Sequence, residues 1–524
     1  MASDRRSRGR AAGGERPPGT YGVGSRLKKP PSPELIEFFQ ETYLAGVDEH
    51  SFEASVQVSL AHVVMLAEEG IIPFEDAGAI LVELLEMGAS GLSGFPIDSG
   101  LGDLLPNMET QLIARIGEEV GGRFHTGRSR GDYYVTISRL KFRRRTLELL
   151  EEVIQFRRAL LSLAGGHLKT LMPGYTHMQH AQPVTLAHYL AGFVHEFERD
   201  FDRLWAALAR INVSPMGLGI LSTTSFALNR GRTATLLGFE GLLRNGRDLS
   251  DRDYVIESAA SAAILMTHLH KLVTDLYEWS TSEFALVRVA DEDSMTSSMM
   301  PQKSNPVVLE DARARTGLVQ GSLMAVLSIL KGSAANNVEV TVADTPGLRA
   351  LTDAAHALRA FRTVLGRVQF DRKRMARLAG EHWSQATDIA DLLVRETGIS
   401  FRQAHRVTGT LVAEALSAGV APLAVTSRML DAAAIQAIGR PLRLPAARLR
   451  QALDPWQGVL HRRLVGGPAP EAMEPVLKDS RDLLASDASK LEELLAGLDA
   501  RRRELYEAAR AMASGASVSA DPPS

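Results

Sequence analysis

Cysteine is absent from the 524 residues of this sequence. Its absence excludes disulfide bonds, thiol nucleophiles, iron–sulfur clusters and zinc sites built from thiolates. Long hydrophobic runs are missing too, since none approaches the ~20 residues of a membrane helix, and no apolar segment typical of a signal peptide follows the N-terminus. Lys and Arg number 59 against 62 Asp and Glu, so bulk charge does not attract polyanions. We therefore expect a cytoplasmic protein with no nucleic-acid or membrane partner.

The composition is that of a folded protein with two polar tails. Apolar residues make up 45% of the chain, enough for a well-buried core. Residues 1–30 are rich in Arg, Gly, Ser and Pro and predict a disordered tail, as do residues 513–524. Arginines of the first tail, such as Arg5 and Arg6, could instead contact nucleic acid or form a targeting sequence. Two boundaries divide the rest of the chain: the Gly121-Gly122 turn, and a change near Phe370 from long predicted helices to shorter ones. The predicted units are 31–124, 125–372 and 373–512.

Three stretches predict long helices. No Gly or Pro falls between Asp132 and Ala164, and apolar residues recur there at steps of four and three. The stretch Val255–Leu286 is apolar and Ala-rich around much of its circumference, which is typical of a helix buried by other helices or by another subunit. A third helix is predicted at Val307–Leu330. Because no strand–helix alternation is present, we predict an all-α fold built on a bundle of long helices.

A polar loop interrupts these helices at Thr296–Pro306. Its prolines end helices, and loops on a rigid scaffold commonly carry catalytic residues. Lys303 could supply a point charge and Asn305 an amide donor for a bound anion. An ordinary loop between two helices is the alternative interpretation.

A second polar segment, His125–Asp132, precedes the first long helix. Ser129 and Arg130 lie near the N-terminus of that helix, where backbone N–H groups and the helix dipole favour anions, and an Arg fork matches a carboxylate. The alternative is a capping turn with solvated arginines. The run Arg143–Arg145 further along is interpreted as a solvated helix face, because no aromatic residues that could stack on bases are interleaved with it.

A third polar segment, Pro173–Pro183, carries two histidines. Zinc ligation by His177 and His180 is one interpretation, although the segment supplies no third ligand. Thr176 and His177 could instead form an acid–base pair. The two histidines His268 and His270 lie in the apolar helix, and for them a core or interface role is expected.

The three segments together, in this order in an all-helical chain, resemble the fumarase/aspartase superfamily and within it the argininosuccinate lyases. The pattern Ser-Ser-x-Met-Pro-x-Lys-x-Asn-Pro at Ser297–Pro306 resembles the superfamily loop, and His125–Arg130 and Pro173–Gln179 are similar to the argininosuccinate lyase versions. The resemblance implies three helical domains, with a central bundle that assembles into a homotetramer and active sites built from three subunits. It also implies anti β-elimination of fumarate from an N-substituted aspartate, without a metal ion or an organic cofactor.

The resemblance assigns a role to each motif residue. Ser297 would be the general base, Lys303 and Asn305 would hold the reacting carboxylate and its developing charge, and Glu310 would orient the histidine. Thr176 and His177 would bind substrate and help to protonate the departing nitrogen. The other substrate-binding positions implied are Ser129, Arg130, Gln179, Ser298 and Met300.

Several positions depart from the family pattern. Gly131 replaces an Asn, Thr296 a Gly, Leu105 a His and His180 an Arg. The contacts to the amine half of the substrate, a Tyr, a Gln and a Lys in the family, fall on Asn337, Val342 and Thr345 in an ungapped alignment.

Groups for proton abstraction and for the succinyl carboxylates are thus mostly kept, whereas those for the arginine half are mostly lost. A pocket that loses its polar partners should accept a different amine. We predict a lyase for another N-substituted aspartate, such as an aminocarboxylate related to ethylenediamine-disuccinate. The alternatives are argininosuccinate itself, a non-catalytic helical scaffold, and a nucleic-acid-binding protein.

Overall fold

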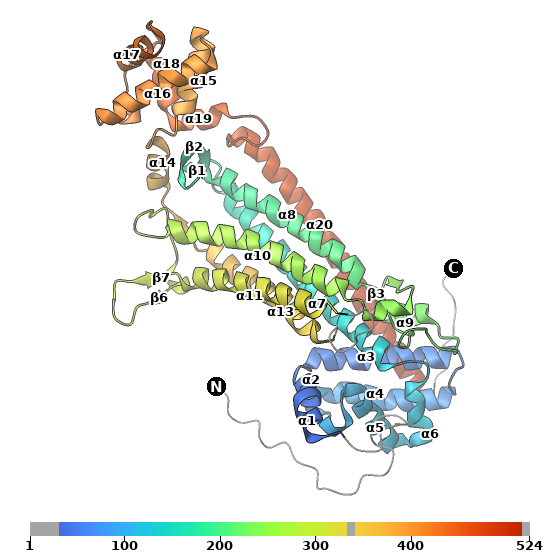
Figure 1. Ribbon diagram of the computed structural model, residues 1–524. Coiled ribbons are helices and arrows are strands. Elements are labelled where there is room, and N and C mark those ends of the chain that lie inside the picture. The colour runs from blue at the N-terminus through green and yellow to red at the C-terminus, as the bar shows by residue number, and fades with distance from the viewer. Residues whose placement is uncertain (1–30, 333–340, 516–524) are drawn as a thin grey trace.

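The computed structural model describes residues 31–332 and 341–515. The predictions for tail residues 1–30 and 516–524, and for Asn337, lie outside the described residues. Figure 1 shows an elongated molecule in which a bundle of long helices separates an N-terminal layer from a C-terminal cluster. The prediction of an all-α fold with a long-helix bundle is confirmed.

The bundle contains five long helices: α7 (Arg130–Gly165), α8 (Leu186–Ile211), α10 (Asp253–Trp279), α11 (Val307–Ile329) and α13 (Asp344–Leu365). Their buried apolar faces form one core, to which α7 contributes Leu149, Val153, Phe156 and Leu160. The helix predicted over Val255–Leu286 ends earlier, at Trp279. The chain reverses there, because Leu286 N–H donates to the Trp279 carbonyl and Ala285 has a positive φ of 46°.

The N-terminal layer contains α3 (Glu49–Glu68), α4 (Phe74–Gly94) and α5 (Leu104–Ile116), with the short helices α1 (Pro33–Leu35), α2 (Thr42–Ala45) and α6 (Glu118–Gly121). Its core also takes side chains from the first turns of α7, from α9 (Arg230–Leu236) and from the end of the last helix. Distant parts of the chain therefore complete this layer.

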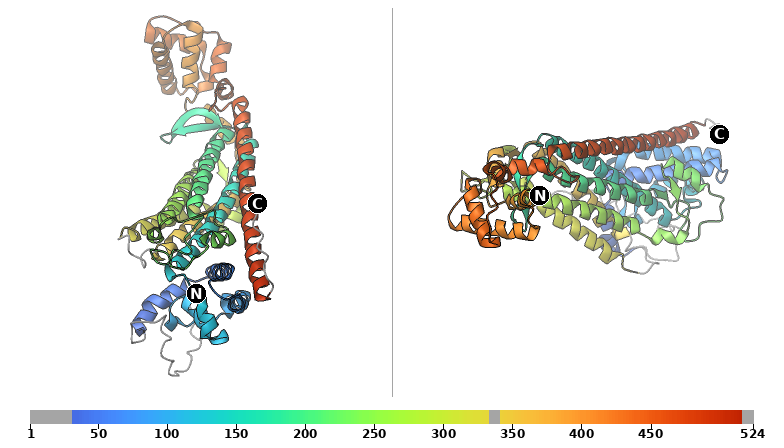
Figure 2. Two further views of the ribbon diagram at one scale, coloured as in Figure 1. Left: turned by 90° about the vertical axis from the view of Figure 1, so that its right-hand side faces the viewer. Right: turned by 90° about the horizontal axis from the view of Figure 1, so that it is seen from above.

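The C-terminal cluster comprises α14 (Arg372–Gly380), α15 (Ala386–Thr397), α16 (Phe401–Ser417), α17 (Ser427–Ile438), α18 (Ala446–Leu453) and α19 (Pro455–His461). Its core runs from Trp383 to Leu453. The last helix, α20 (Pro470–Ala513), leaves the cluster and runs along the bundle to the N-terminal layer (Figure 2). The predicted unit 373–512 therefore includes a helix whose buried side chains belong to the other two cores.

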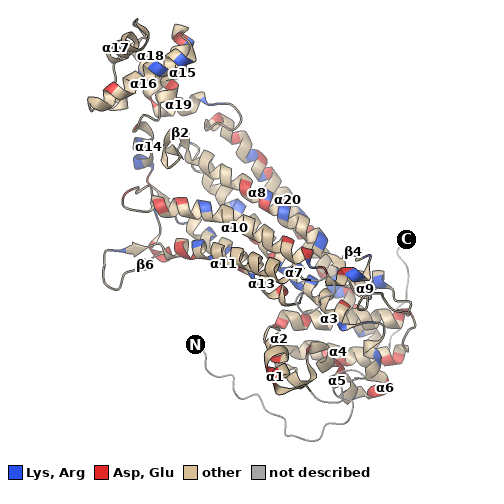
Figure 3. Cartoon of the chain, viewed as in Figure 1, with Lys and Arg blue, Asp and Glu red and all other residues tan. Residues whose placement is uncertain are grey.

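The strands are short and pair two by two. The antiparallel pairs are β1 (Leu171–Thr176) with β2 (Gln179–Thr185), β5 (Val287–Arg288) with β8 (Gln369–Phe370), and β6 (Met295–Thr296) with β7 (Ser304–Asn305), while β3 (Val213–Ser214) and β4 (Gly241–Leu242) are parallel. In the described ranges, none of the helices is both long and apolar enough for a membrane span. Figure 3 shows both signs of charge interspersed along α20.

Candidate active site

The sequence-predicted residues lie in separate places on the chain. Ser129 and Arg130 begin α7, whereas the turn with Thr176 and His177 follows the opposite end of the same helix. With 36 residues, α7 is about 54 Å long at 1.5 Å per residue. The loop with Ser297 leaves the bundle between α10 and α11, at the same end as β1 and β2 (Figure 1). One chain therefore does not bring Ser129 and Arg130 to the other residues.

A capping box forms the start of α7. Ser129 Oγ accepts from Gly131 N–H at 3.2 Å, and the Asp132 carboxylate accepts from Ser129 N–H at 2.9 Å. Asp132 also accepts from Gly217 N–H at 3.0 Å and Gly219 N–H at 2.8 Å, so it ties the loop after β3 to the helix end. Burial raises the pKa of Asp132 to about 6.

Two guanidinium groups flank this helix end. Arg130 is exposed and pairs with Asp103 at 3.5 Å. Arg128, which sequence reasoning passed over, is buried, and its guanidinium carbon lies 3.9 Å from the centre of the Phe124 ring. Burial lowers the pKa of Arg128 to about 10, so it stays charged at neutral pH and adds positive potential near Ser129. The Arg-Ser-Arg pattern could have pointed to it.

The departure at Gly131 has a local explanation. A Cβ at this position would lie 2.6 Å from Ile220 Cδ1 and 3.3 Å from the Gly219 carbonyl oxygen. The loop that Asp132 holds therefore occupies the space next to the helix where the resemblance expects an asparagine side chain. A carboxylate at this helix end would contact Ser129, Arg130 and backbone N–H groups rather than an amide side chain.

The segment Pro173–Pro183 is a β-hairpin rather than an irregular turn. Thr176 pairs with Gln179, which leaves His177 and Met178 as a two-residue turn with φ values of 53° and 57°. Turns of this type usually carry Asn-Gly, so no residue pair at this position predicts a hairpin. The side chains of Thr176, His177 and Gln179 are exposed at this tip. The turn thus presents a hydroxyl, an imidazole and an amide outward from the bundle.

The loop with Ser297 is a second hairpin, closed by the pairing of Met295 with Asn305 and of Thr296 with Ser304. Thr296 lies in the extended strand β6, and its φ is not positive. The backbone at this position therefore does not require the glycine that the family pattern expects. Ser297 Oγ accepts hydrogen bonds from the N–H groups of Met299 at 3.2 Å and Met300 at 3.0 Å. Hydrogen bonds to the ionised form of a group favour that form, so these two amides stabilise negative charge on Oγ.

Lys303 lies in the same hairpin as Ser297, and Glu310 lies in the helix that follows it. Lys303 has an exposed side chain, and its backbone N–H donates to the Met300 carbonyl at 3.1 Å. Glu310, in the first turn of α11, accepts from the Tyr277 hydroxyl at 3.1 Å, and this hydrogen bond raises the pKa of Tyr277. Its partner within the chain is a phenol, so the role of orienting a histidine stays a prediction.

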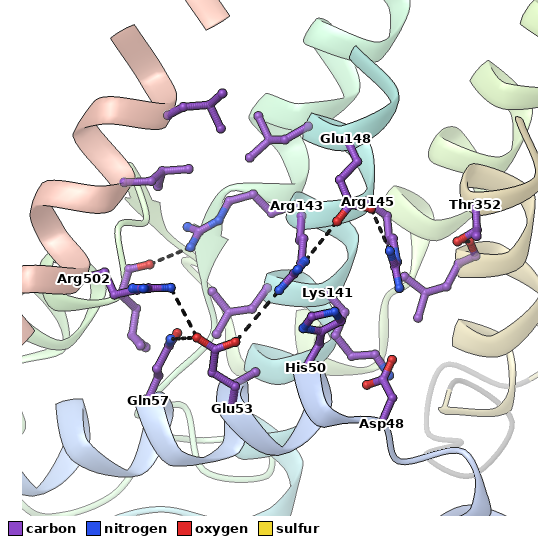
Figure 4. Close-up of a pocket in the computed structure, with 18 of the residues that line it drawn as sticks. Asp48, His50, Glu53, Gln57, Lys141, Arg143, Arg145, Glu148, Thr352 and Arg502 are labelled. Atoms are coloured by element: carbon purple, nitrogen blue, oxygen red, sulfur yellow. Dashed lines mark hydrogen bonds and ion pairs between the residues drawn. The ribbon is translucent and has the colours of Figure 1, made fainter. Parts of the chain in front are cut away.

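Val342 and Thr345, which align with family positions that contact the amine half of the substrate, lie near the N-terminus of α13. Val342 is exposed, and Thr345 lines a cleft of about 450 Å³ between α3, α7, α13 and α20. Figure 4 shows acidic and basic side chains facing one another in this cleft, where Arg502 reaches Glu53 at 3.4 Å. The cleft also contains Lys141, which lies 11 residues after Arg130 on α7 and thus about 16 Å along that helix.

The described ranges contain no group of three or more His, Asp or Glu side chains placed to hold a metal ion. His268, which was expected in the core or an interface, donates from Nδ1 to the buried Asp200 carboxylate at 2.7 Å. In the Arg143–Arg145 run, Arg143 has an enclosed guanidinium that donates to Asn212, Leu237 and Gly238, and only Arg144 is exposed. The run is therefore solvated in part.

Comparison with known proteins agrees with these motifs. Residues 36–321, more than half of the chain, match the family described as "Lyase", and residues 383–459 match "Argininosuccinate lyase C-terminal". Argininosuccinate lyase from Methanothermobacter thermautotrophicus is 39% identical over 88% of this chain and 98% of its own. The chain is an argininosuccinate lyase-like member of the fumarase/aspartase superfamily.

Solved structures of the superfamily agree with this assignment. The crystal structure of EDDS lyase in complex with formate has a TM-score of 0.82 and 31% identity, over 93% of this chain and 97% of that one. A fumarate lyase from Mesorhizobium sp. BNC1, with a TM-score of 0.66 and 21% identity over 84% and 97% of the two chains, shares the fold. The prediction of a fumarate-releasing carbon–nitrogen lyase is confirmed, and the scaffold alternative is set aside.

Proposed function

We propose that this lyase eliminates fumarate from an N-substituted aspartate whose amine half differs from arginine, with Ser297 as the base. The observation that carries the proposal is the geometry of the Ser297 hairpin, in which two backbone amides donate to Oγ and Lys303 and Asn305 follow in the same loop. This is an arrangement in which an alkoxide can form beside a cation and an amide donor.

The chemistry requires that negative charge be stabilised at two stages. The proton leaves a carbon next to a carboxylate, and the resulting carbanion is an aci-carboxylate with extra negative charge. Lys303 and Asn305 supply a cation and an amide donor for it, and loss of one such donor typically costs ~10²–10³ in rate. Arg130 and the α7 N-terminus bind the other carboxylate. Thr176 and His177 assist protonation of the nitrogen as it leaves.

A site of this kind needs several chains, because Arg130 lies a helix length away from His177. We propose a homotetramer in which three chains contribute to each site. Exposed apolar side chains on the bundle support this: Leu318, Met324 and Leu327 on α11 are 47%, 60% and 41% exposed. A Cβ added at Gly317 or Gly321 on this helix would meet nothing within 4 Å, so a neighbouring helix can approach closely.

The amine half of the substrate would lie toward the Thr345 cleft. Thr345 offers a neutral hydroxyl where the family pattern has a lysine, and both acidic groups such as Asp48 and Glu53 and basic groups such as Lys141 and Arg502 line the same cleft. An amine product with further polar groups fits such a lining, and EDDS lyase is a structural neighbour with 31% identity. Argininosuccinate is the second candidate, because relatives such as the 39% identical archaeal protein are named argininosuccinate lyases.

The test runs the reaction in reverse. Fumarate is supplied with arginine, ethylenediamine and other amines, and the loss of its ultraviolet absorbance is followed. We expect turnover with a polyamine or aminocarboxylate partner and little with arginine, whereas arginine as the best partner would favour the second candidate. Ser297→Ala should abolish turnover while substrate still binds, and Ser304→Ala, at an exposed serine of the same hairpin with no assigned role, is the matched control. Near-normal turnover of the Ser297→Ala variant would rule out the assigned base.

Mixing two inactive variants tests the shared site. If Ser297 and His177 of one site come from different chains, Ser297→Ala and His177→Ala chains that are dissociated and reassembled together should regain about a quarter of the sites by random assortment. Each variant reassembled alone is the control and should stay inactive. Leu318→Glu should dissociate the assembly in sedimentation, and a monodisperse wild-type monomer would contradict the three-chain site.

A further inference from the structure

The turn between β1 and β2 is strained at two consecutive residues. His177 and Met178 both have left-handed backbone conformations, which carry a steric cost for any residue with a Cβ. Neither is one of the Asn, Asp or Gly residues that favour such a turn. A hairpin of two strands is only marginally stable by itself. Contacts outside the turn must therefore hold these two residues in place.

A series of ring contacts supports the hairpin from one side. Tyr175 and His180 are partners across the strands, and their ring centroids lie 5.1 Å apart. The imidazole of His180 packs on the imidazole of His382, with centroids 4.4 Å apart and planes at 56°. The ring of Tyr175 also meets that of Phe284 at 6.2 Å. His180 thus connects the hairpin to the start of the C-terminal cluster.

His382 is held in position by the C-terminal cluster. It and Trp383 follow α14 with φ values of 55° and 60°, a second pair of left-handed residues. Trp383 is buried in the core of the cluster, so the indole anchors the backbone that presents the His382 ring to the hairpin. Gln182 of β2 reaches the same cluster, since its Nε2 donates to Thr387 Oγ1 at 3.2 Å.

The contact depends on protonation. Two imidazolium rings at this distance repel each other, so the close ring contact needs at least one neutral ring. Burial and then the neighbouring His382 lower the pKa of His180, whereas the Glu381 carboxylate acts in the opposite direction. The charged and titratable groups near the hairpin on the elements packed against it include Arg372, Lys373, Arg374 and Arg377 of α14, Asp371 and Glu381 at the ends of that helix, His188 of α8 and His461 of α19.

We propose that His180 and His382 are positioning residues for elimination, because their ring contact holds Thr176 and His177 in the reactive geometry and positive charge on both rings loosens the turn. The catalytic consequence rests on the proposed function, but the contact does not depend on substrate. His180 stands where the family pattern has an arginine, so this arrangement distinguishes the chain from that pattern.

Hydrogen exchange of the intact protein tests the contact without substrate. His382→Phe keeps a ring that cannot carry charge, and His382→Ala removes the ring altogether. At about pH 8 the Ala variant should exchange the amides of residues 171–185 roughly three- to tenfold faster than wild type, the range expected for loss of one ring pair, while the Phe variant matches wild type. As the pH falls below the ordinary histidine pKa of about 6.5, wild type should loosen and the Phe variant should not. Equal exchange in all three proteins would overturn the proposal.

Kinetics test the consequence. His382→Ala should lower kcat more than it changes KM, and His382→Phe should restore most of the lost turnover and move the acid limb of the pH profile to lower pH. Thermal unfolding shows whether either variant fails to fold. An unchanged kcat and acid limb in the Ala variant would refute the positioning role. Absence of wild-type turnover with every amine would refute the proposed function instead, and the exchange result would still stand.

Discussion

Removal of one partner from the buried ion pair between α7 and α20 should destabilise the protein strongly. The side chain of Arg157 is 0% exposed, and its Nη1 lies 2.6 Å from Oδ2 of Asp487, which is 11% exposed. Glu198 is the other carboxylate nearby, at 3.9 Å. Asp487→Ala leaves a guanidinium in the core with only this distant partner, and breaking a buried pair in this way costs about 3–5 kcal/mol.

The double variant Arg157→Met/Asp487→Leu is the control. Apolar side chains of similar volume often replace a buried pair without net loss, so the double variant should recover most of the stability. Urea unfolding at one fixed protein concentration, followed by tryptophan fluorescence and circular dichroism, gives the free energies. A loss below about 1 kcal/mol in Asp487→Ala, as for an exposed pair, would refute the reasoning. So would a double variant no more stable than the single one.

Three further predictions concern buried groups near the candidate site. Burial and the charge of Arg128 lower the pKa of His62 to about 3. The unfolded chain therefore takes up a proton that the folded chain excludes, so His62 contributes a fall in unfolding free energy of about 1.4 kcal/mol per pH unit between the ordinary histidine pKa of about 6.5 and the lowered value of about 3. Because the raised pKa of Asp132 acts in the opposite direction over part of this range, the contribution is measured as the difference in unfolding free energy between wild type and His62→Gln in urea. A difference that does not change with pH would contradict it. Gly174→Ala should distort the β1–β2 hairpin and lower turnover, because its Cβ would lie 2.6 Å from the Gln182 carbonyl oxygen. Gly192→Ala is the control, since a Cβ there meets nothing within 4 Å and turnover should be unchanged. Equal activities of the two variants would refute this prediction. Gly131→Asn should lower the melting temperature, because the new side chain would clash with Ile220. Adding Ile220→Ala should restore the melting temperature. An unchanged melting temperature in Gly131→Asn would contradict the steric explanation.

The sequence predicts the helices well because a helix depends on neighbours three and four residues away. The helix predicted from Asp132 to Ala164 is α7, and the one from Val307 to Leu330 is α11, each within two residues at either end. The motif at Ser297–Pro306 identifies the superfamily because the chemistry requires those residue types at that spacing. In both cases the signal lies within a short segment.

The parts that sequence reasoning missed depend on contacts between distant residues. The β1–β2 hairpin lacks the usual turn residues, and rings from the C-terminal cluster support it instead. Arg128 is a buried cation only because Phe124 and Tyr133 enclose it. The path of α20 along the bundle is set by partners such as Arg157, 330 residues away.

The sequence by itself thus determined the class of fold and, through the loop motif and its companion segments, the superfamily, because each can be read from residues close together in the chain. Only the tertiary structure decided where the residues of those segments lie. Since a rigid helix of 36 residues separates Arg130 from the hairpin with His177, no folding of one chain around α7 can bring them together, and this length is why we propose that the site is shared between chains.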